Sequence, residues 1–180
     1  MLYIFLANGF ETVEAMAPID LCRRAGLDIK TVSITNDKTV ISSHNIPVVA
    51  DITLNEVNFD DAAMLILPGG MPGTTNLEKC DTLINELKKH YNAGKKIAAI
   101  CAAPKILGAL NMLAGKKACI FPGMEDNLIG AIVEYNKVSK DGNIITSRGM
   151  GCATDFGAAI VAEFCGQEKA DELLKTVVYK

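Results

Sequence analysis

The sequence predicts an α/β fold in which a mainly parallel sheet carries helices on both faces. Short β-branched or apolar runs alternate with longer amphipathic ones along the chain, and this alternation is typical of βαβ units. With 180 residues, the chain is long enough to bury a substantial core. No internal repeat, linker or low-complexity segment divides it, so we expect residues 1–180 to form a single domain.

The first half of the chain predicts strands and helices in alternation. The β-branched or apolar runs set the strands, and the helix that starts at Glu11 stops at Gly26, which suits a helix C-terminus. In chain order these elements are a strand at 2–7, a helix at 11–25, a strand at 29–34, a polar hairpin region through 50, a strand at 63–68 and a helix at 76–92.

The second half continues the alternation and ends in helices. Asp141-Gly142 is a strong turn signal between two apolar runs, and Gly166 separates the last two helical segments. In chain order we expect a strand at 96–100, a helix at 104–113, a strand at 118–121, a hairpin at 137–147 and helices at 155–165 and 168–178.

Charge and hydropathy exclude several classes of protein. The 18 Lys and Arg residues against 21 Asp and Glu give a net charge of −3, with no basic run that would attract nucleic acid. No uncharged apolar segment approaches the ~18 residues of a membrane span. The first residues, MLYIFLANG, lack the basic start and cleavage site of a signal peptide. We therefore expect a cytoplasmic protein without nucleic-acid or membrane partners.

The six cysteines are scattered and form no C-x-x-C motif. A disulfide scaffold is usual for short secreted chains, and this chain is not of that kind. A metal site is also unfavoured, because only His44 and His90 could supplement the scattered thiols as ligands. We expect no metal, and most cysteines to be small buried hydrophobic residues. Both histidines are expected on the solvated surface.

Cys101 differs from the other cysteines because it lies where a predicted strand becomes a helix. In parallel sheets, sites form at the carboxyl ends of the strands. A nucleophile on a tight strand-to-helix turn needs small residues two positions before and after it, as Ala99 and Ala103 provide. The following helix, with Pro104 in its first turn, favours a thiolate. The alternative is a buried structural cysteine.

Two further strand ends carry candidate groups. Gly69 and Gly70 follow a buried strand, and the N–H groups of Gly70 and Ala102 together suit an oxyanion hole, although an ordinary glycine turn is the alternative. Glu14 shares a helix face with Glu11 near the end of the first strand. Buried beside a thiol, it would have a raised pKa, whereas a purely structural acidic residue is the alternative.

Five segments together resemble the ThiJ/PfpI superfamily, in the branch that contains the parkinsonism-associated protein deglycase. The resemblance covers essentially the whole chain, and the segments occur in the family's order: ANGFETVEAMAPID (7–20), RRAG (23–26), LPGG (67–70), AAICAAP (98–104) and TSRG (146–149). The resemblance implies a flavodoxin-like three-layer sandwich, a homodimer, and no metal or organic cofactor.

The resemblance also implies roles for individual residues. Cys101 corresponds to the family's reactive cysteine and Glu14 to its partner glutamate, while Gly70 and Ala102 correspond to the oxyanion-hole amides. The remaining pocket residues implied are Gly69, Arg24, Arg148 and Phe121. Phe121 stands where the family often has a histidine, so a Cys-His-Glu triad is not available. A histidine base is typically worth ~10²–10⁴-fold in rate.

These residues favour a cysteine-dependent glyoxalase or deglycase that acts on methylglyoxal or its adducts and releases a hydroxy acid. The substrate is then a small aldehyde or a glycated molecule. A redox-sensing cysteine protein or stress chaperone without robust turnover is the alternative, because the same amides would hold an oxidised sulfur. Peptidase or amidotransferase activity fits less well, because the histidine is missing.

Overall fold

The computed structural model describes residues 1–179. Its strands are β1 (Leu2–Leu6), β2 (Ile29–Ser33), β3 (Thr39–Ile41), β4 (Pro47–Val49), β5 (Ile52–Thr53), β6 (Met64–Leu67), β7 (Lys96–Ile100), β8 (Lys117–Ala118), β9 (Ile132–Val133), β10 (Val138–Asp141) and β11 (Ile144–Ser147). Its α-helices are α1 (Thr12–Arg24), α2 (Gly73–Glu78), α3 (Asp81–Asn92), α4 (Pro104–Ala109), α5 (Ala153–Cys165) and α6 (Gln167–Thr176).

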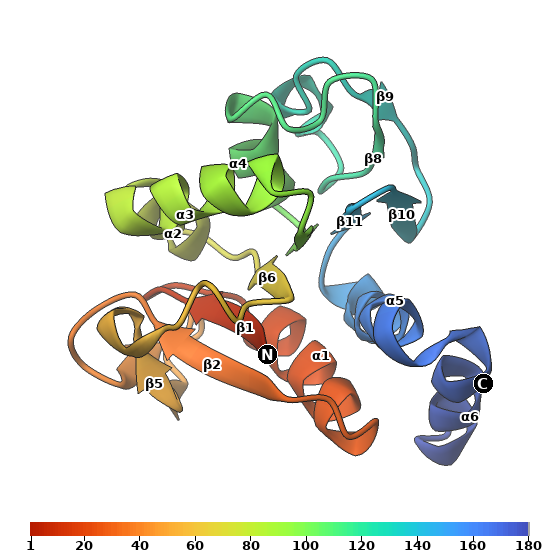
Figure 1. Cartoon of the computed structure of the whole chain (residues 1–180), viewed down its shortest axis with the longest axis horizontal. Coiled ribbons are helices and arrows are strands. Elements are labelled where there is room, and N and C mark those ends of the chain that lie inside the picture. Colours follow the sequence, from red (N-terminus) through yellow and green to blue (C-terminus); the bar gives the residue numbers. More distant parts are fainter. Residues whose placement is uncertain (180) are drawn as a thin grey trace.

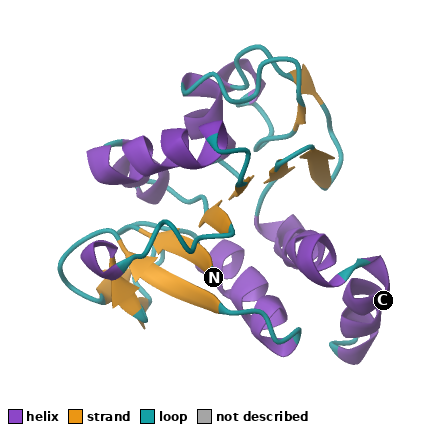
Figure 2. Cartoon of the chain, in the orientation of Figure 1, coloured by secondary structure: helices purple, strands orange, loops and turns teal. Residues whose placement is uncertain are grey.

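The main sheet has the order β10-β11-β7-β6-β1-β2-β5 within the described residues. Its strands pair in parallel, except that the edge strand β10 runs antiparallel to β11. The short pairs β3–β4 and β8–β9 lie outside it. Figure 2 shows the strands in orange and the helices in purple. The predicted α/β class with a mainly parallel sheet is therefore confirmed.

Helices cover both faces of this sheet and make a three-layer sandwich. In Figure 1, α2, α3 and α4 lie on one side of the sheet and α1, α5 and α6 on the other. Side chains of β1 alternate between the two cores, as the two-residue period of a strand requires: Phe5 faces the first core, and Ile4 and Leu6 face the second. The same alternation sends Leu65 and Ile66 of β6 to opposite faces.

The predicted helix at 76–92 is wrong in one respect, because the structure divides it. The first helix starts earlier, at Gly73, whose backbone N–H donates to the Gly9 carbonyl at 3.1 Å. Cys80 is extended, with φ −84° and ψ 90°, and separates α2 from α3. This break allows Leu77 and Leu83 both to be fully buried in the same core.

Two other predicted elements are shorter than expected. The helix predicted at 104–113 ends at Ala109, and Asn111 adopts a positive φ of 57°. Of the strand predicted at 118–121, only Ala118 pairs with a neighbour, as the end of the two-residue strand β8 at 117–118. Beyond them, the Cys119 N–H donates to the Thr146 side chain at 2.9 Å and the Phe121 N–H to the Cys101 carbonyl at 3.0 Å, so this segment binds the site loops instead of continuing a ladder.

His90 is buried, which corrects the expectation of a surface residue. Its Nε2 lies 3.0 Å from the Lys96 carbonyl oxygen. Burial lowers the pKa of His90 to about 4, so the ring is neutral at pH 7. His44, in contrast, is exposed, as expected.

Helices long and apolar enough to cross a bilayer are absent from residues 1–179.

Candidate active site

Four neighbouring strands of the sheet, β1, β6, β7 and β11, end at a common place. Glu14 follows β1, Gly69 follows β6, Cys101 follows β7 and Gly149 follows β11. The Gly69 N–H donates to Glu14 Oε2 at 3.0 Å. A Cβ atom on Gly69 would lie 2.6 Å from both the Cys101 Cβ and Glu14 Oε2. The parallel sheet thus brings together the residues that the sequence predicted to meet at its carboxyl edge.

Cys101 occupies a sharp turn between β7 and α4. Its φ is +62°, in the left-handed region that residues with a side chain rarely adopt. Two backbone hydrogen bonds hold the turn: the Cys101 N–H donates to the Ser147 carbonyl at 2.9 Å, and the Cys101 carbonyl accepts from Phe121. Ala99 and Ala103 are fully buried beside it. The predicted nucleophile elbow is present, and the small side chains permit it.

Backbone N–H groups from two separate loops donate to the Cys101 thiol. They belong to Gly70 and Ala102, the two predicted oxyanion-hole residues. Gly70 has a φ of +89°, and a Cβ there would lie 2.3 Å from the Glu11 nitrogen, so only glycine fits. An oxygen atom on a carbon bonded to this sulfur would lie within reach of the same two donors.

The Glu14 carboxyl group is buried and forms a hydrogen bond with the Cys101 thiol. Burial raises the pKa of Glu14 from 4.5 to about 7, and the negative charge of Glu11 acts in the same direction. The hydrogen bonds from Cys101 and Gly69 oppose this shift without cancelling it. At neutral pH, Glu14 is therefore present in both protonation states, which suits a group that takes up and returns a proton.

The expectation of a thiolate at Cys101 is wrong for the resting site. Burial, together with the neighbouring Glu14 carboxylate, raises the pKa of the Cys101 thiol to about 12. The Ala102 and Gly70 amides lower the pKa, but by less. Helix α4 begins at Pro104 and is only six residues long, so its dipole contributes little against the effect of burial.

Phe121 and Arg148 line a pocket of about 350 Å³. The Phe121 ring lies 3.4 Å from the position that a Cβ on Gly149 would take, and Glu14 Oε1 lies 3.9 Å from the same position. Arg148 donates from Nη1 to the Tyr135 carbonyl at 3.2 Å. Phe121 is therefore near the thiol–carboxyl pair, whereas the Arg148 side chain is engaged with Tyr135.

Arg24 does not join the site within this chain, which corrects that prediction. It lies in the last turn of α1, ten residues beyond Glu14, and a helix rises about 15 Å over that length. Its side chain is half-exposed and pairs with Asp20 at 2.6 Å.

Sequence reasoning did not single out two parts of the site. The Ser147 carbonyl accepts a hydrogen bond from the Cys101 N–H and so holds the turn. The position of Ser147 at the end of a predicted strand was the sequence signal that could have identified it. Gly149 separates Glu14 from the adjoining pocket, and it appears in the TSRG segment without a distinctive pattern of its own.

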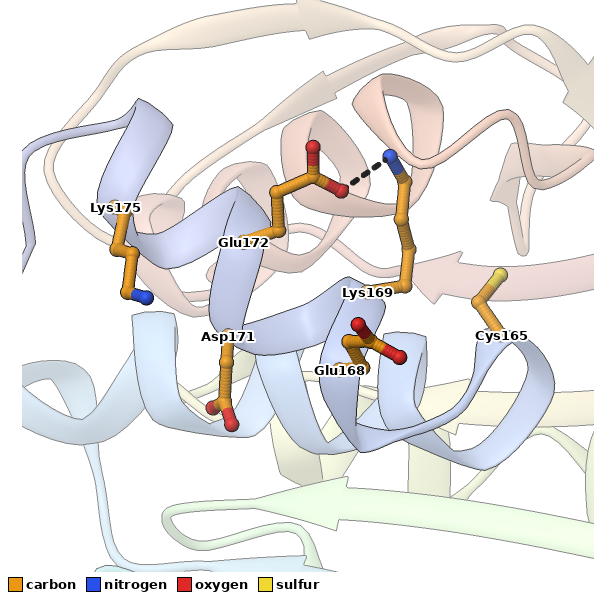
Figure 3. A pocket seen from close by; sticks show the side chains of 6 residues that line it. All are labelled: Cys165, Glu168, Lys169, Asp171, Glu172 and Lys175. Carbon is orange, nitrogen blue, oxygen red and sulfur yellow. Dashed lines mark hydrogen bonds and ion pairs between the residues drawn. The ribbon is translucent and has the colours of Figure 1, made fainter.

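A wider hollow of about 860 Å³ lies along α6, away from these strand ends. Figure 3 shows Cys165 at the end of α5 beside the charged side chains of α6, with an ion pair between Lys169 and Glu172. Apart from Cys165, which ends α5, all of these side chains belong to α6, so they form an open, charged helix face. Among residues 1–179, no group of three or more His, Cys, Asp or Glu side chains is arranged to hold a metal.

Several proteins of known sequence resemble this chain. Protein DJ-1 homolog A of Arabidopsis thaliana is 37% identical over 171 residues, covering 93% of this chain. Protein dj-1beta of Drosophila melanogaster is 33% identical, covering 96% of this chain and 93% of that protein. A deglycase of Pyrococcus horikoshii is 34% identical, covering 82% of this chain and 90% of that protein. The chain spans only 44% and 40% of the two Arabidopsis relatives, DJ-1 homologs A and B.

Solved structures show the same fold. An oxidized Toxoplasma gondii DJ-1 superposes with a TM-score of 0.94 at 29% identity, covering 98% of this chain and 97% of that one. A DJ-1 superfamily protein of Salmonella typhimurium gives 0.93 at 31% identity, covering 99% and 98%. The profile described as the DJ-1/PfpI family matches residues 1–163. With the fold and the thiol–carboxyl pair in place, these matches show that the chain belongs to the DJ-1/PfpI family.

Proposed function

We propose that the protein is a cysteine-dependent glyoxalase or deglycase that converts methylglyoxal, or its adducts, to a 2-hydroxy acid. The observation that carries the proposal is the pairing of the Cys101 thiol with Glu14, whose pKa is raised to about 7 by burial. Two amides already donate to the sulfur. One relative, 34% identical, is named a deglycase, which supports the same chemistry.

In the first step, Sγ of Cys101 adds to the aldehyde carbon. The S–H proton passes to the Glu14 carboxylate, and the π electron pair of the carbonyl moves to its oxygen. The Gly70 and Ala102 amides stabilise that oxyanion. Glu14 then returns the proton to the oxygen, which leaves a neutral hemithioacetal and a free carboxylate.

In the second step, Glu14 moves a proton between adjacent carbons. It removes the proton from C1, and the electron pair forms an enediolate with the neighbouring ketone. The proton on the C1 oxygen passes to the C2 oxygen, Glu14 returns its own proton to C2, and C1 becomes a carbonyl carbon. The product is a thioester of a 2-hydroxy acid on Cys101. Water then cleaves the thioester and regenerates the thiol, so the overall reaction adds one water and needs no external oxidant or reductant.

The test is the turnover of methylglyoxal and the formation of lactate by the full chain. We expect Cys101→Ser and Glu14→Gln each to lose at least ~10²-fold in kcat/KM, the scale of general acid–base catalysis. Arg24→Ala, away from the site, serves as the control. Wild-type kcat/KM should rise with pH and level off above about 7, as Glu14 becomes the carboxylate. Turnover that survives in Cys101→Ser would rule out the mechanism.

A second candidate is a redox-sensing cysteine protein or stress chaperone. The amides of Gly70 and Ala102 that donate to Sγ would equally hold a sulfinate, and a relative from Toxoplasma gondii has been solved in an oxidized state. The raised thiol pKa favours the enzyme, because the thiolate is the form that peroxide oxidises. Glu14→Gln separates the two: it removes the charge that raises the thiol pKa, so oxidation by peroxide should become faster while turnover is lost.

We further propose that the protein acts in the cytosol. All six cysteines are free, which a reducing compartment maintains.

A further inference from the structure

We propose that the pocket beside Phe121 and Met150 binds an apolar substituent of the carbonyl substrate, so that aryl or longer alkyl 2-oxoaldehydes react in preference to methylglyoxal. The preference in turnover rests on the proposed function, whereas binding of the substituent in the pocket does not depend on it. The pocket has a volume of about 350 Å³ and is lined by Phe121, Pro122, Arg148, Gly149, Met150 and Gly151, with Lys137 and Cys152 at its edge.

Two residues of the pocket lining, Phe121 and Gly149, lie next to the reacting groups. The Phe121 N–H donates to the carbonyl of Cys101 itself. A Cβ on Gly149 would lie 3.4 Å from the Phe121 ring and 3.9 Å from Glu14 Oε1, so the ring and the carboxyl group flank the space that the missing side chain leaves. A substrate bonded to Sγ and reached by Glu14 therefore borders this pocket.

Gly69 packs tightly against the reacting groups. A single added carbon on Gly69 would lie 2.6 Å from the Cys101 Cβ and from Glu14 Oε2, and 3.0 Å from the Ile100 carbonyl. At Gly149, in contrast, an added carbon would make only ordinary van der Waals contacts. Of these two glycines, Gly149 therefore offers more room to the substituent on the ketone carbon, and Gly149 lines the pocket.

The pocket offers apolar surface that is open to a ligand. Phe121 is 47% exposed and Met150 is 56% exposed, so both side chains present apolar surface to solvent at the pocket. An aromatic ring placed against Phe121, or a thioether contact from Met150, would bury this surface. A methyl group leaves most of it in water.

The cationic side chains at the edge are already engaged. Lys137 pairs with Asp155 at 3.1 Å. Arg148 donates to the Tyr135 carbonyl at 3.2 Å and lies over the Tyr135 ring at 5.8 Å from its centroid. A carboxylate on the substrate would have to compete with these partners, so the pocket fits an uncharged substituent.

The experiment compares initial kcat/KM values for methylglyoxal and phenylglyoxal. One extra methylene in an apolar pocket changes kcat/KM by about 10–200-fold. For the wild type we expect a preference for phenylglyoxal of at least about tenfold. Phe121→Ala should reduce this ratio about tenfold, and Met150→Ser should reduce it in the same direction. Ile132→Ala is the matched control, an equally exposed apolar residue outside the pocket lining, and should leave the ratio unchanged.

A second measurement separates binding from turnover. Iodoacetamide alkylation of Cys101 is followed with acetophenone or acetone present, neither of which has an aldehyde to isomerise. Protection by acetophenone but not by acetone, together with its loss in Phe121→Ala, supports the pocket. This holds even if the protein turns over neither glyoxal, and in that case only the proposed function fails. Equal rates with both glyoxals, or equal protection by both ketones, would overturn the pocket assignment.

Discussion

At the scale of single residues, Glu14 is the group whose charge links the site to the stability of the fold. Its pKa is about 7 in the folded protein and 4.5 when unperturbed, and burial is the main cause. The pKa of Glu14 is higher in the folded state than in the unfolded chain. Its contribution to the free energy of unfolding is therefore fully present below pH 4.5 and is lost as the pH rises through about 7. Over that window, the 2.5-unit difference corresponds to about 3 kcal/mol.

We expect Glu14→Gln to remove this pH dependence. The amide keeps the shape of the side chain but does not ionise, so the variant should lose about 3 kcal/mol less unfolding free energy than the wild type between pH 4.5 and pH 8. Urea denaturation at both pH values measures the difference. Identical pH profiles for the two proteins would show that Glu14 titrates normally in the folded state.

The chemistry of Cys101 shows where residue-level prediction succeeds and where it stops. The tight turn follows from its own neighbours, since Ala99 and Ala103 are small, and the structure confirms it with a φ of +62°. The thiol pKa depends on burial by segments distant in sequence, including Glu14 and Gly70. No local pattern reports that burial, so the expected thiolate was wrong.

At the scale of elements, α1 must be held in place for Glu14 to reach the thiol, and α5 holds it. A Cβ on Gly157 of α5 would lie 2.8 Å from the Pro18 Cα of α1 and 2.8 Å from a Leu21 methyl group. Glycine at this position therefore allows the two helices to approach closely. Pro18 also leaves the Glu14 carbonyl without its usual helical donor.

We expect Gly157→Ala to destabilise the protein by about 1–3 kcal/mol, the usual range for overpacking. Displacement of α1 should also lower kcat/KM, because Glu14 moves with it. Gly151→Ala is the control for stability, because a Cβ there would meet no atom within 4 Å. Urea denaturation compares the two variants, and turnover compares Gly157→Ala with the wild type. A Gly157→Ala protein as stable as the control would show that the helices can move apart freely.

Elements with a clear period were predictable, whereas those set by packing were not. The parallel strands and the amphipathic helices α5 and α6 carry their own patterns. The break at Cys80 does not, because the apolar spacing of 77, 83, 84 and 87 continues across it. The two-residue strands β5 and β9 are too short to show a period. Arg24 was placed at the site by resemblance alone, and the length of α1 puts it elsewhere.

At the scale of the whole molecule, the expected homodimer stays a prediction. Its surface would have to cover exposed apolar side chains, and several occur on the N-terminal turn of α1 and around the β3–β4 hairpin: Val13, Ile41, Ile46 and Val49. The two segments are joined by the bridge between Phe10 and Ser42. An apolar surface of this kind commonly marks an interface.

We expect Val49→Lys to shift the protein from dimer to monomer, because a charge would be buried in the interface. Val49 is 73% exposed in the single chain, so the substitution should leave the fold intact. Val178→Lys changes another exposed valine in the C-terminal segment and is the matched control. Sedimentation velocity at several concentrations distinguishes the two. A wild type that is monomeric throughout would contradict the prediction.

The parallel register of β7 and β11 also has a consequence for how the protein is made. The Cys101 turn is held by the carbonyl of Ser147, which leaves the ribosome well after Cys101 itself. A nascent chain that ends before β11 therefore carries the cysteine without this support and without Gly149. We expect its thiol to titrate near the free value of ~8.5 and to become sheltered only when the last strand is added.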